Sequence, residues 1–191
     1  MKKKIIVGIS GASGAIYGLR LLEALKSIGT IEIYLTISQT GKTLLRDEIA
    51  DDALDRAIQL ADNYYETHEL GASIASGSFL TDGMIIAPCS AKSLAAIAHG
   101  LGDNLINRAA DVALKERRRL VLLFRETPLH LTHIENMAQV TRMGGIILPP
   151  VPAFYHRPSS IDDIVNHSVG KALDLFAIEH NLYKRWDGLK S

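Results

Sequence analysis

Residues 5–15 read Ile5-Ile6-Val7-Gly8-Ile9-Ser10-Gly11-Ala12-Ser13-Gly14-Ala15, a short apolar run that passes directly into a turn of small residues. The apolar run predicts a buried strand over residues 4–9. Apolar residues then recur at helical spacing, which predicts a helix that ends at Gly29; they are Ile16, Leu19, Leu22 and Leu25. A strand joined to a helix by a tight turn is the first half of a βαβ unit.

The same alternation continues along the chain. Further strands are expected near residues 31–37, 84–87, 120–123 and 145–148, and helices near 42–47, 51–60, 90–99, 103–115, 131–142 and 160–176. Strands that are apolar throughout suit the centre of a parallel sheet that is covered on both faces. The pattern predicts one α/β domain over residues 1–191, with a doubly wound parallel sheet of the flavodoxin or Rossmann type.

Composition excludes several classes of function. The chain has 191 residues, which suits one domain, and its 21 Lys and Arg residues balance 21 Asp and Glu residues. No positive field draws it to nucleic acid or to an anionic membrane, and no apolar run is long enough to span a bilayer. A single cysteine, Cys89, excludes an internal disulfide and favours a cytoplasmic location.

The small-residue turn after the first strand has two interpretations. It could bring backbone N–H groups and a positive helix end close to a phosphate, or it could be a plain turn in which Ser13 caps the helix. The glycines at 8, 11 and 14 do not match the dinucleotide motif G-x-G-x-x-G. The stretch about 20 residues further on, residues 34–38, also lacks the acidic residue that would bind a ribose. A mononucleotide therefore fits better than NAD.

A second cluster of hydroxyl and amide groups follows the strand near residues 84–87. Residues 87–93 read Ala-Pro-Cys-Ser-Ala-Lys-Ser and open a helix, so they too could bind an anion. We interpret Cys89 as a packing residue rather than a nucleophile, because no activating base is near it in sequence. Residues 41–43 read Gly-Lys-Thr but lack the preceding glycine of a P-loop.

Charged residues follow the strand near 120–123. Arg125 could hold a phosphate or flavin and Glu126 could transfer protons, although a local ion pair between them explains the same residues. Arg117, Arg118 and Arg119 are most simply a solvated helix end. The spacing of His130, His133 and Glu135 lacks a further ligand of the usual kind, so no metal site is expected.

Taken together, several ordered segments resemble the UbiX-type flavin prenyltransferases, including the Pad-like members, over about residues 4–186. They are Gly11-Ala12-Ser13-Gly14, Pro88-Cys89-Ser90, residues 108–116, Arg125-Glu126-Thr127-Pro128, residues 133–137 and Pro152-Ala153-Phe154-Tyr155. The resemblance implies a flavodoxin-like fold, a homododecamer and FMN bound between subunits. It also implies the transfer of a dimethylallyl group from dimethylallyl phosphate to N5 and C6 of reduced FMN, for use by a UbiD-type decarboxylase.

The resemblance also implies roles for particular residues. The flavin contacts would be Gly11, Ala12, Ser13, Ser38, Ser90, Ala91, Lys92, Ser93 and Arg125. The prenyl phosphate would contact Tyr155 and Lys171, joined near the anion by Arg108, Lys115 and Arg125. Glu48, Glu126 and Ser13 would handle protons. Two residues depart from the family pattern. At Lys171 many relatives have Arg, so a guanidinium that can donate two parallel hydrogen bonds to phosphate is replaced by an ammonium point charge. Phe124 stands where Pro or Thr is expected.

Two other functions fit the same broad pattern. One is an FMN-dependent cysteine decarboxylase of related fold, which the segments around Arg125, Glu126 and Tyr155 argue against. The other is a flavin-binding subunit, without activity of its own, that stabilises an aromatic acid decarboxylase.

Overall fold

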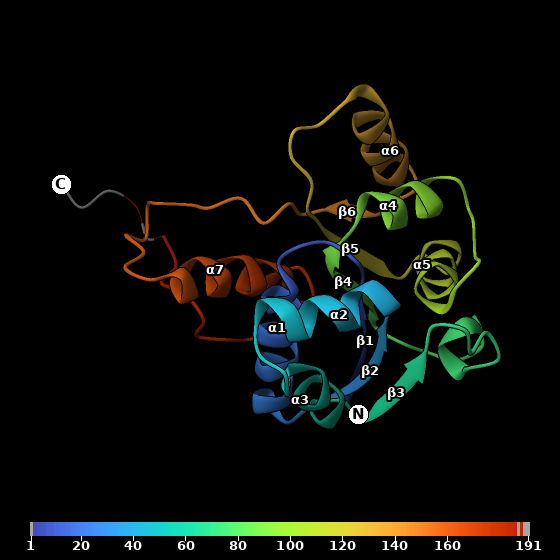
Figure 1. The fold of residues 1–191 in the computed structure, drawn as a ribbon, viewed down its shortest axis with the longest axis horizontal. Helices are drawn as coiled ribbons and strands as arrows, with labels where there is room; N and C mark the ends of the chain where they lie inside the picture. Colours follow the sequence, from blue (N-terminus) through green and yellow to red (C-terminus); the bar gives the residue numbers. More distant parts are fainter. Residues whose placement is uncertain (1, 187, 189–191) are drawn as a thin grey trace.

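Six parallel strands form one sheet in the computed structural model, which describes residues 2–186 and 188 (Figure 1). The predicted domain, 1–191, includes a few positions that lie outside the described residues. The strands are β1 (Lys3–Ile9), β2 (Ile31–Ile37), β3 (Asn63–Glu66), β4 (Gly83–Cys89), β5 (Arg119–Phe124) and β6 (Ile146–Ile147). Their order in the sheet, β3-β2-β1-β4-β5-β6, is the doubly wound Rossmann order and confirms the predicted fold class.

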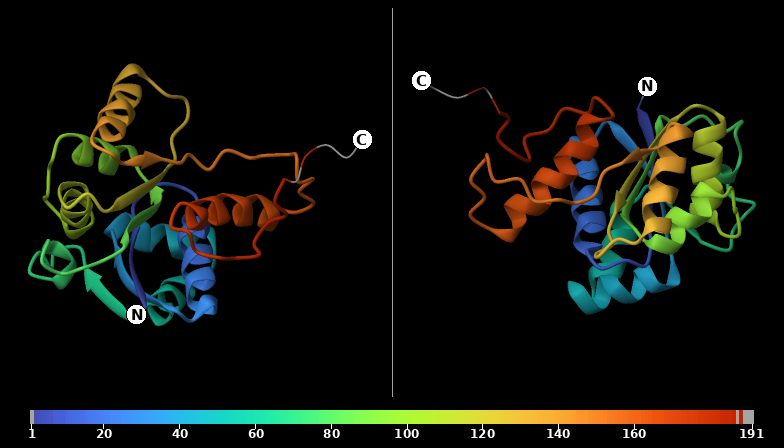
Figure 2. Two further views of the ribbon diagram at one scale, coloured as in Figure 1. Left: turned by 180° about the vertical axis from the view of Figure 1, so that it is seen from behind. Right: turned by 90° about the horizontal axis from the view of Figure 1, so that it is seen from above.

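Helices cover both faces of this sheet (Figure 2). They are α1 (Ala15–Ile28), α2 (Gln39–Glu48), α3 (Ala53–Leu60), α4 (Ala91–Ala98), α5 (Leu105–Lys115), α6 (Leu131–Arg142), α7 (Ile161–Asp174) and the short 3₁₀ helix η1 (Ser73–Ala75). One apolar cluster joins the sheet to α1, α2, α3 and α7, and a second joins it to α4, α5 and α6. In the described part of the chain, no helix combines the length and apolar character that crossing a bilayer requires.

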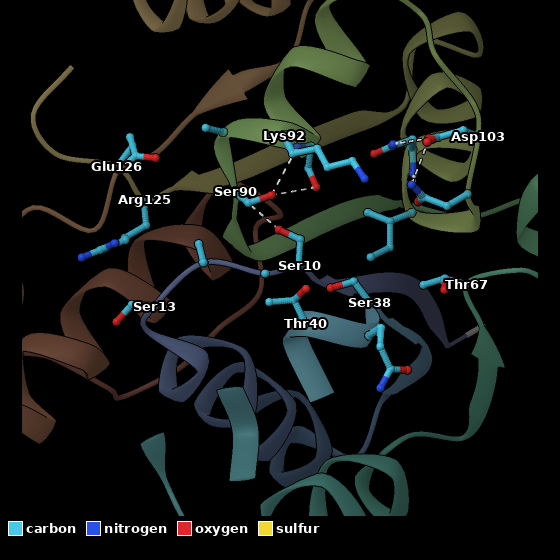
Figure 3. A pocket seen from close by; sticks show the side chains of 18 residues that line it. Ser10, Ser13, Ser38, Thr40, Thr67, Ser90, Lys92, Asp103, Arg125 and Glu126 are labelled. Atoms are coloured by element: carbon cyan, nitrogen blue, oxygen red, sulfur yellow. Dashed lines mark hydrogen bonds between the residues drawn. The ribbon is translucent and has the colours of Figure 1, made fainter. Parts of the chain in front are cut away.

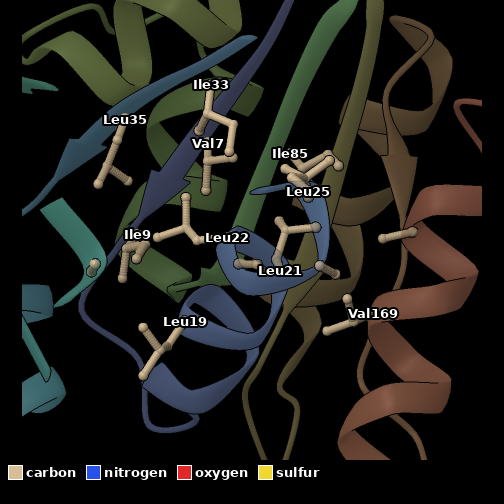
Figure 4. Close-up of a cluster of buried hydrophobic side chains, with 14 of the residues drawn as sticks. Val7, Ile9, Leu19, Leu21, Leu22, Leu25, Ile33, Leu35, Ile85 and Val169 are labelled. Atoms are coloured by element: carbon tan, nitrogen blue, oxygen red, sulfur yellow. The ribbon is translucent and has the colours of Figure 1, made fainter. Parts of the chain in front are cut away.

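Strand side chains alternate between the two clusters, as the pleat of a sheet requires. Val7 and Ile9 point into the first cluster, where they meet Leu22 of α1, while Ile6 belongs to the second (Figure 4). α7 completes the first layer by packing Val169 near Leu25 of α1 (Figure 4). The central strands are therefore covered on both faces, which explains their continuous apolar sequences.

Several bounds differ from the predicted elements by one or two residues, and two differences are larger. Strand β3 was not predicted, because its four residues are all partly exposed and it lies at the edge of the sheet. Helix α2 begins at Gln39 rather than near Lys42, because the Ser38 hydroxyl accepts a hydrogen bond from the N–H of Gly41 and caps the helix.

The chain reverses its direction of travel across the sheet between β1 and β4. From β1 it moves outward through β2 and β3, and it then returns to pair β4 on the other side of β1. Loops from these two neighbouring strands diverge at their carboxyl ends and leave a crevice. This is the position at which doubly wound sheets bind ligands.

Candidate active site

A cavity of about 560 Å³ lies at this crevice (Figure 3). Its lining includes Glu126 and all nine residues that the resemblance assigned to the flavin. The nine are Gly11, Ala12, Ser13, Ser38, Ser90, Ala91, Lys92, Ser93 and Arg125. The residues come from the loops after β1, β2, β4 and β5. The geometry therefore brings together segments that are up to about a hundred residues apart in the sequence.

The loop after β1 is shaped by two glycines. At Gly11 an added Cβ would lie 2.6 Å from the Cβ of Thr40, so only glycine fits between this loop and α2. Gly14 has a positive φ of 99° and is the N-cap of α1. The alternative in which Ser13 caps the helix is therefore wrong, since the serine precedes the cap.

The side chain of Glu48, the last residue of α2, lies at the start of α1. Its Oε2 accepts hydrogen bonds from the backbone N–H groups of Gly14 at 2.8 Å and Ala15 at 2.9 Å. A carboxylate at this position is stabilised by the helix dipole. The expectation that these helix-start amides face a phosphate is corrected accordingly, because Glu48, which does not line the cavity, already binds them.

Two serines cap the helices that border the cavity. Ser38 caps α2, and the Ser90 hydroxyl accepts from the N–H of Ser93 at 3.2 Å at the start of α4. Ser90 also donates to the Ser93 hydroxyl at 3.2 Å. These short polar side chains keep hydroxyl groups at the cavity wall while they satisfy free helix N–H groups.

Ser10 joins the two loops at the base of the cavity. It is 1% exposed; its hydroxyl donates to the Pro88 carbonyl at 2.9 Å and accepts from the N–H of Ser90 at 2.8 Å (Figure 3). The backbone N–H of Ser10 also donates to the Pro88 carbonyl at 3.1 Å. The sequence analysis did not select Ser10, although a serine directly after a buried strand is the signal that selected Ser90.

Arg125 and Glu126 follow β5 and both line the cavity. The N–H of Arg125 donates to the Cys89 carbonyl at 3.0 Å, while the Glu126 Oε1 accepts from the N–H of Thr127 at 3.1 Å. No ion pair joins the two side chains in the part of the chain that the structure describes. The ion-pair explanation of these two residues is therefore not supported, and the Arg125 guanidinium has no ion-pair partner among the described residues.

The start of α5 forms a further wall that the sequence analysis missed. Asn104 caps the helix, and Asn107 donates through Nδ2 to Asp103 Oδ1 at 2.8 Å. The Asn107 Oδ1 is buried without a hydrogen-bond partner among the described residues, which is costly unless a ligand supplies a donor. Asn104 before Leu105 is a recognisable helix start, but nothing local in the sequence places it at the cavity.

Apart from Arg125, the residues assigned to the prenyl phosphate lie outside this cavity within one chain. Tyr155 is on the extended segment before α7, and Lys171 is on α7, whose Asp174 lies 4.0 Å from its Nζ. Arg108 is on α5, where it pairs with Asp111 at 2.8 Å. Lys115 is on the last turn of α5, remote from the cavity end, and pairs with Glu116.

Other candidate residues have structural roles in the described chain. Cys89 is fully buried in β4, and burial raises the pKa of its thiol, which agrees with a packing role. Arg118 donates to the carbonyl oxygens of Gly77 and Phe79, so the arginine run is more than a solvated helix end. The rings of His130 and His133 stack with centroids 3.6 Å apart.

Comparison with known proteins identifies the family of this chain. The Flavoprotein family model matches residues 1–173. The chain is 54% identical over 185 residues to the flavin prenyltransferase UbiX of Thauera aromatica, an alignment that covers 97% of this chain and 94% of the relative.

The chain belongs to the flavin prenyltransferase family.

Solved structures of related proteins agree with this assignment. The flavin prenyltransferase chain superposes with a TM-score of 0.96 on AnUbiX (PadA1), solved in complex with FMN and dimethylallyl pyrophosphate, at 45% identity and 100% coverage of both chains. It superposes with a TM-score of 0.94 on a dodecameric FMN-dependent UbiX-like decarboxylase from Escherichia coli O157:H7, at 46% identity, with 97% of this chain and 100% of the other covered.

Proposed function

We propose that this flavin prenyltransferase joins the dimethylallyl group of dimethylallyl phosphate to N5 and C6 of reduced FMN, releasing phosphate. The observation that carries the proposal is the cavity at the strand reversal, where the nine residues that we expect to contact the flavin lie together. A cavity of about 560 Å³ is within the usual range for small-molecule sites. The bound flavin supplies the nucleophilic atoms, and the protein supplies binding and orientation.

The cavity lining suits FMN. Hydroxyl groups of Ser38 and Ser90 and the guanidinium of Arg125 can donate to phosphate and ring oxygens. Gly11 brings its backbone close to Thr40 and adds no side chain to the cavity wall at that point. The Asn107 Oδ1, which has no partner among the described residues, is an acceptor suited to a ring N–H of the flavin.

The prenyl donor needs cationic groups, because breaking its carbon–oxygen bond develops charge on the leaving phosphate. We assign this role to Lys171, Arg108, Lys115 and Arg125, with Tyr155 as a hydroxyl donor. Aromatic rings and the flavin stabilise the allyl cation. These donor residues lie on separate elements of one chain, so we propose that the site is completed between subunits of a homo-oligomer, as a dodecamer would allow.

Ring closure must remove a proton from the flavin carbon, and we assign this to Glu126, with Ser13 and Glu48 as further proton-handling groups. Glu126 and Ser13 line the cavity, whereas Glu48 binds the amides at the start of α1. Glu126→Gln keeps size and hydrogen bonding but cannot accept a proton. The variant should bind FMN and accumulate flavin in which only one bond to the prenyl group has formed.

One assay separates the candidate functions. Purified protein is incubated with reduced FMN and dimethylallyl phosphate, and the flavin mass is measured; a mass gain of one prenyl group on the flavin supports the proposal, and the absorption spectrum distinguishes the ring-closed product from its singly attached isomer. Release of carbon dioxide from a cysteine substrate without flavin modification would instead favour a cysteine decarboxylase. Flavin binding with neither product would leave a non-catalytic flavin-binding subunit.

We further propose that the product serves a UbiD-type decarboxylase and that the protein acts in the cytoplasm. The single buried cysteine suits a reducing compartment. Adding the flavin product to a UbiD-type decarboxylase that lacks its cofactor should restore decarboxylation. Unmodified FMN is the control in that experiment.

A further inference from the structure

One face of α7 carries a line of polar side chains beside the extended segment of residues 149–160. His167, Lys171 and Asp174 recur at intervals of four and three residues, so they lie on the same face of the helix. The extended segment runs alongside α7 in both views of Figure 2. There the Tyr155 hydroxyl lies 2.8 Å from Nε2 of His167.

His167 is held firmly in its position. Its residue is only 8% exposed, and its ring is enclosed by three aromatic neighbours. The His156 ring stacks on it at 4.8 Å with an angle of 5°, while Tyr155 at 5.6 Å and Tyr183 at 4.8 Å meet it edge to face. A ring packed in this way has little freedom to move away from the Tyr155 hydroxyl.

The packing of Tyr183 is itself fixed by Asp174. The Tyr183 hydroxyl donates to Asp174 Oδ2 at 2.5 Å, and Arg185 donates to Oδ1 at 2.5 Å. His180 lies 3.2 Å from the same carboxylate. A continuous set of contacts therefore leads from Asp174 through Tyr183 and His167 to Tyr155.

The charge state of His167 follows from its surroundings. Burial lowers its pKa, and the neighbouring His156 and Lys171 lower it further, while Asp174 opposes them. A neutral imidazole has one N–H donor and one acceptor nitrogen. The direction of the hydrogen bond to Tyr155 then decides where the tyrosine proton points.

We propose that His167 is a positioning residue for the prenyl donor, and that its Nε2–H donates to the Tyr155 oxygen and directs the tyrosine O–H to the donor phosphate. A phosphate offers only acceptor oxygens, so Tyr155 must use its single proton toward the phosphate. It can do so only if His167 is the donor between the two side chains. This inference rests on the proposed function, because it assumes that Tyr155 contacts the prenyl phosphate.

The test compares KM for dimethylallyl phosphate, kcat and FMN affinity in His167→Phe, Tyr155→Phe and the double variant. His167→Phe keeps a ring against His156 but loses the hydrogen bond, and we expect KM for the donor to rise about 5- to 10-fold with FMN affinity unchanged. Tyr155→Phe should raise KM at least as much. Because His167 acts through the Tyr155 hydroxyl, adding His167→Phe to Tyr155→Phe should change KM by less than about 2-fold.

Conservative variants test the direction of the hydrogen bond. His167→Gln offers an amide N–H donor, so its donor KM should lie close to the wild-type value. His167→Glu has a side chain of the same shape as glutamine but offers only acceptors, so its donor KM should stay raised as in His167→Phe. Ser168→Ala is the matched control, because it removes a neighbouring buried hydroxyl that donates within the helix to Ile164. FMN affinity reports folding in every variant.

Several outcomes would overturn the inference. These are an unchanged donor KM in His167→Phe, additive effects of the two substitutions, or restoration by His167→Glu. Each of these leaves the proposed function intact if the wild-type protein makes prenylated FMN. A wild-type protein that binds FMN but never modifies it would overturn both.

Discussion

Ser10 is a small buried residue whose substitution should affect both stability and FMN binding, because its hydroxyl connects the loops after β1 and β4. Ser10→Ala would leave the Ser90 N–H without its partner, while the Pro88 carbonyl would keep only the hydrogen bond from the Ser10 backbone N–H. We expect a loss of about 1 to 3 kcal/mol in the free energy of unfolding, together with weaker FMN binding. Urea denaturation and flavin fluorescence titration measure the two effects.

Ser27→Ala is the control for this prediction, since the exposed Ser27 hydroxyl donates only to the Ala24 carbonyl one turn earlier. It should change neither quantity by much. Equal effects of the two substitutions would mean that Ser10 has no special role between the loops.

At this scale the sequence predicted the residues that follow strand ends, because their position in the sheet follows from the alternation of strands and helices. Ser90 and Arg125 belong to this group, whereas Ser38 was predicted only through the family resemblance; all three line the cavity. Asn107 could not be predicted, because its place at the cavity depends on how α5 packs across the second face of the sheet. Roles that depend on a neighbouring subunit, as proposed for Lys115, stay predictions.

Helix α1 depends on a carboxylate from another element. Glu48 Oε2 binds the first free N–H groups of α1, so Glu48→Ala should lower the free energy of unfolding by about 1 to 2 kcal/mol. Glu48→Gln retains an acceptor oxygen and should cost less than Glu48→Ala. Urea denaturation of both variants gives the comparison.

Asp47→Ala is the matched control, because Asp47 is an exposed acid one residue earlier on α2. A similar loss in this variant would point to general charge effects rather than to capping of α1. Reduced prenyl transfer in Glu48→Gln at unchanged stability would instead support the proton-handling role.

Helix α7 is joined to the C-terminal segment through Asp174, which makes that contact sensitive to acid. Burial alone would raise the pKa of Asp174, but hydrogen bonds from Arg185 and Tyr183 outweigh it and lower the pKa to about 2. Because the folded pKa is below the unfolded value, this carboxylate stabilises the fold above about pH 4 and loses the effect as pH falls toward about 2.

We therefore expect wild type to lose about 1 to 2 kcal/mol more than Asp174→Asn in unfolding free energy between about pH 5 and about pH 2. Urea denaturation across this range measures the difference. Asp55→Asn, which removes an exposed acid of α3, should follow the wild-type curve. A wild-type curve parallel to that of Asp174→Asn would contradict the prediction.

Element boundaries show where local sequence is sufficient. β2 and α6 were predicted at their observed bounds, because each has strong periodicity and clear ends. β3 escaped prediction because an edge strand of four partly exposed residues has no apolar pattern of its own. It is stabilised by pairing with β2, a contact that local periodicity does not encode.

Several large apolar side chains are exposed on the surface of the single chain. Leu131 is 68% exposed and Ile134 is 50% exposed on one side of α6, and Phe154 on the extended segment is 71% exposed. If the chain assembles as proposed, Leu131→Glu should shift the protein toward smaller species in analytical ultracentrifugation. Buried apolar surface drives such association, and a carboxylate opposes its burial.

Gln139→Glu adds a negative charge near the other end of α6 at an exposed position and is the control. It should leave the sedimentation profile unchanged. Wild-type protein that sediments as a monomer at all concentrations would contradict the assembly itself.

The order of strands belongs to this scale as well. The alternation of strands and helices predicts parallel neighbours, but it does not say on which side of β1 the chain will pair β4. That choice follows from the long return through residues 67–82 and from how helices cover both faces. The position of the cavity depends on it; the sequence predicted a doubly wound sheet and, through family resemblance, the flavin residues, but not the order of the strands.

The reactivity of Cys89 toward a thiol reagent can report local opening of the core. The thiol is the only one in the chain, it is fully buried, and its residue pairs with Phe124 at the centre of the sheet. Its side chain lies in the cluster that α4, α5 and α6 cover, so a thiol reagent can reach it only when this packing opens, and the rate of labelling measures how often that happens. FMN bound at the loops after these strands should slow that labelling in proportion to its occupancy, and a reaction at the speed of a free thiol would show that the packing opens readily.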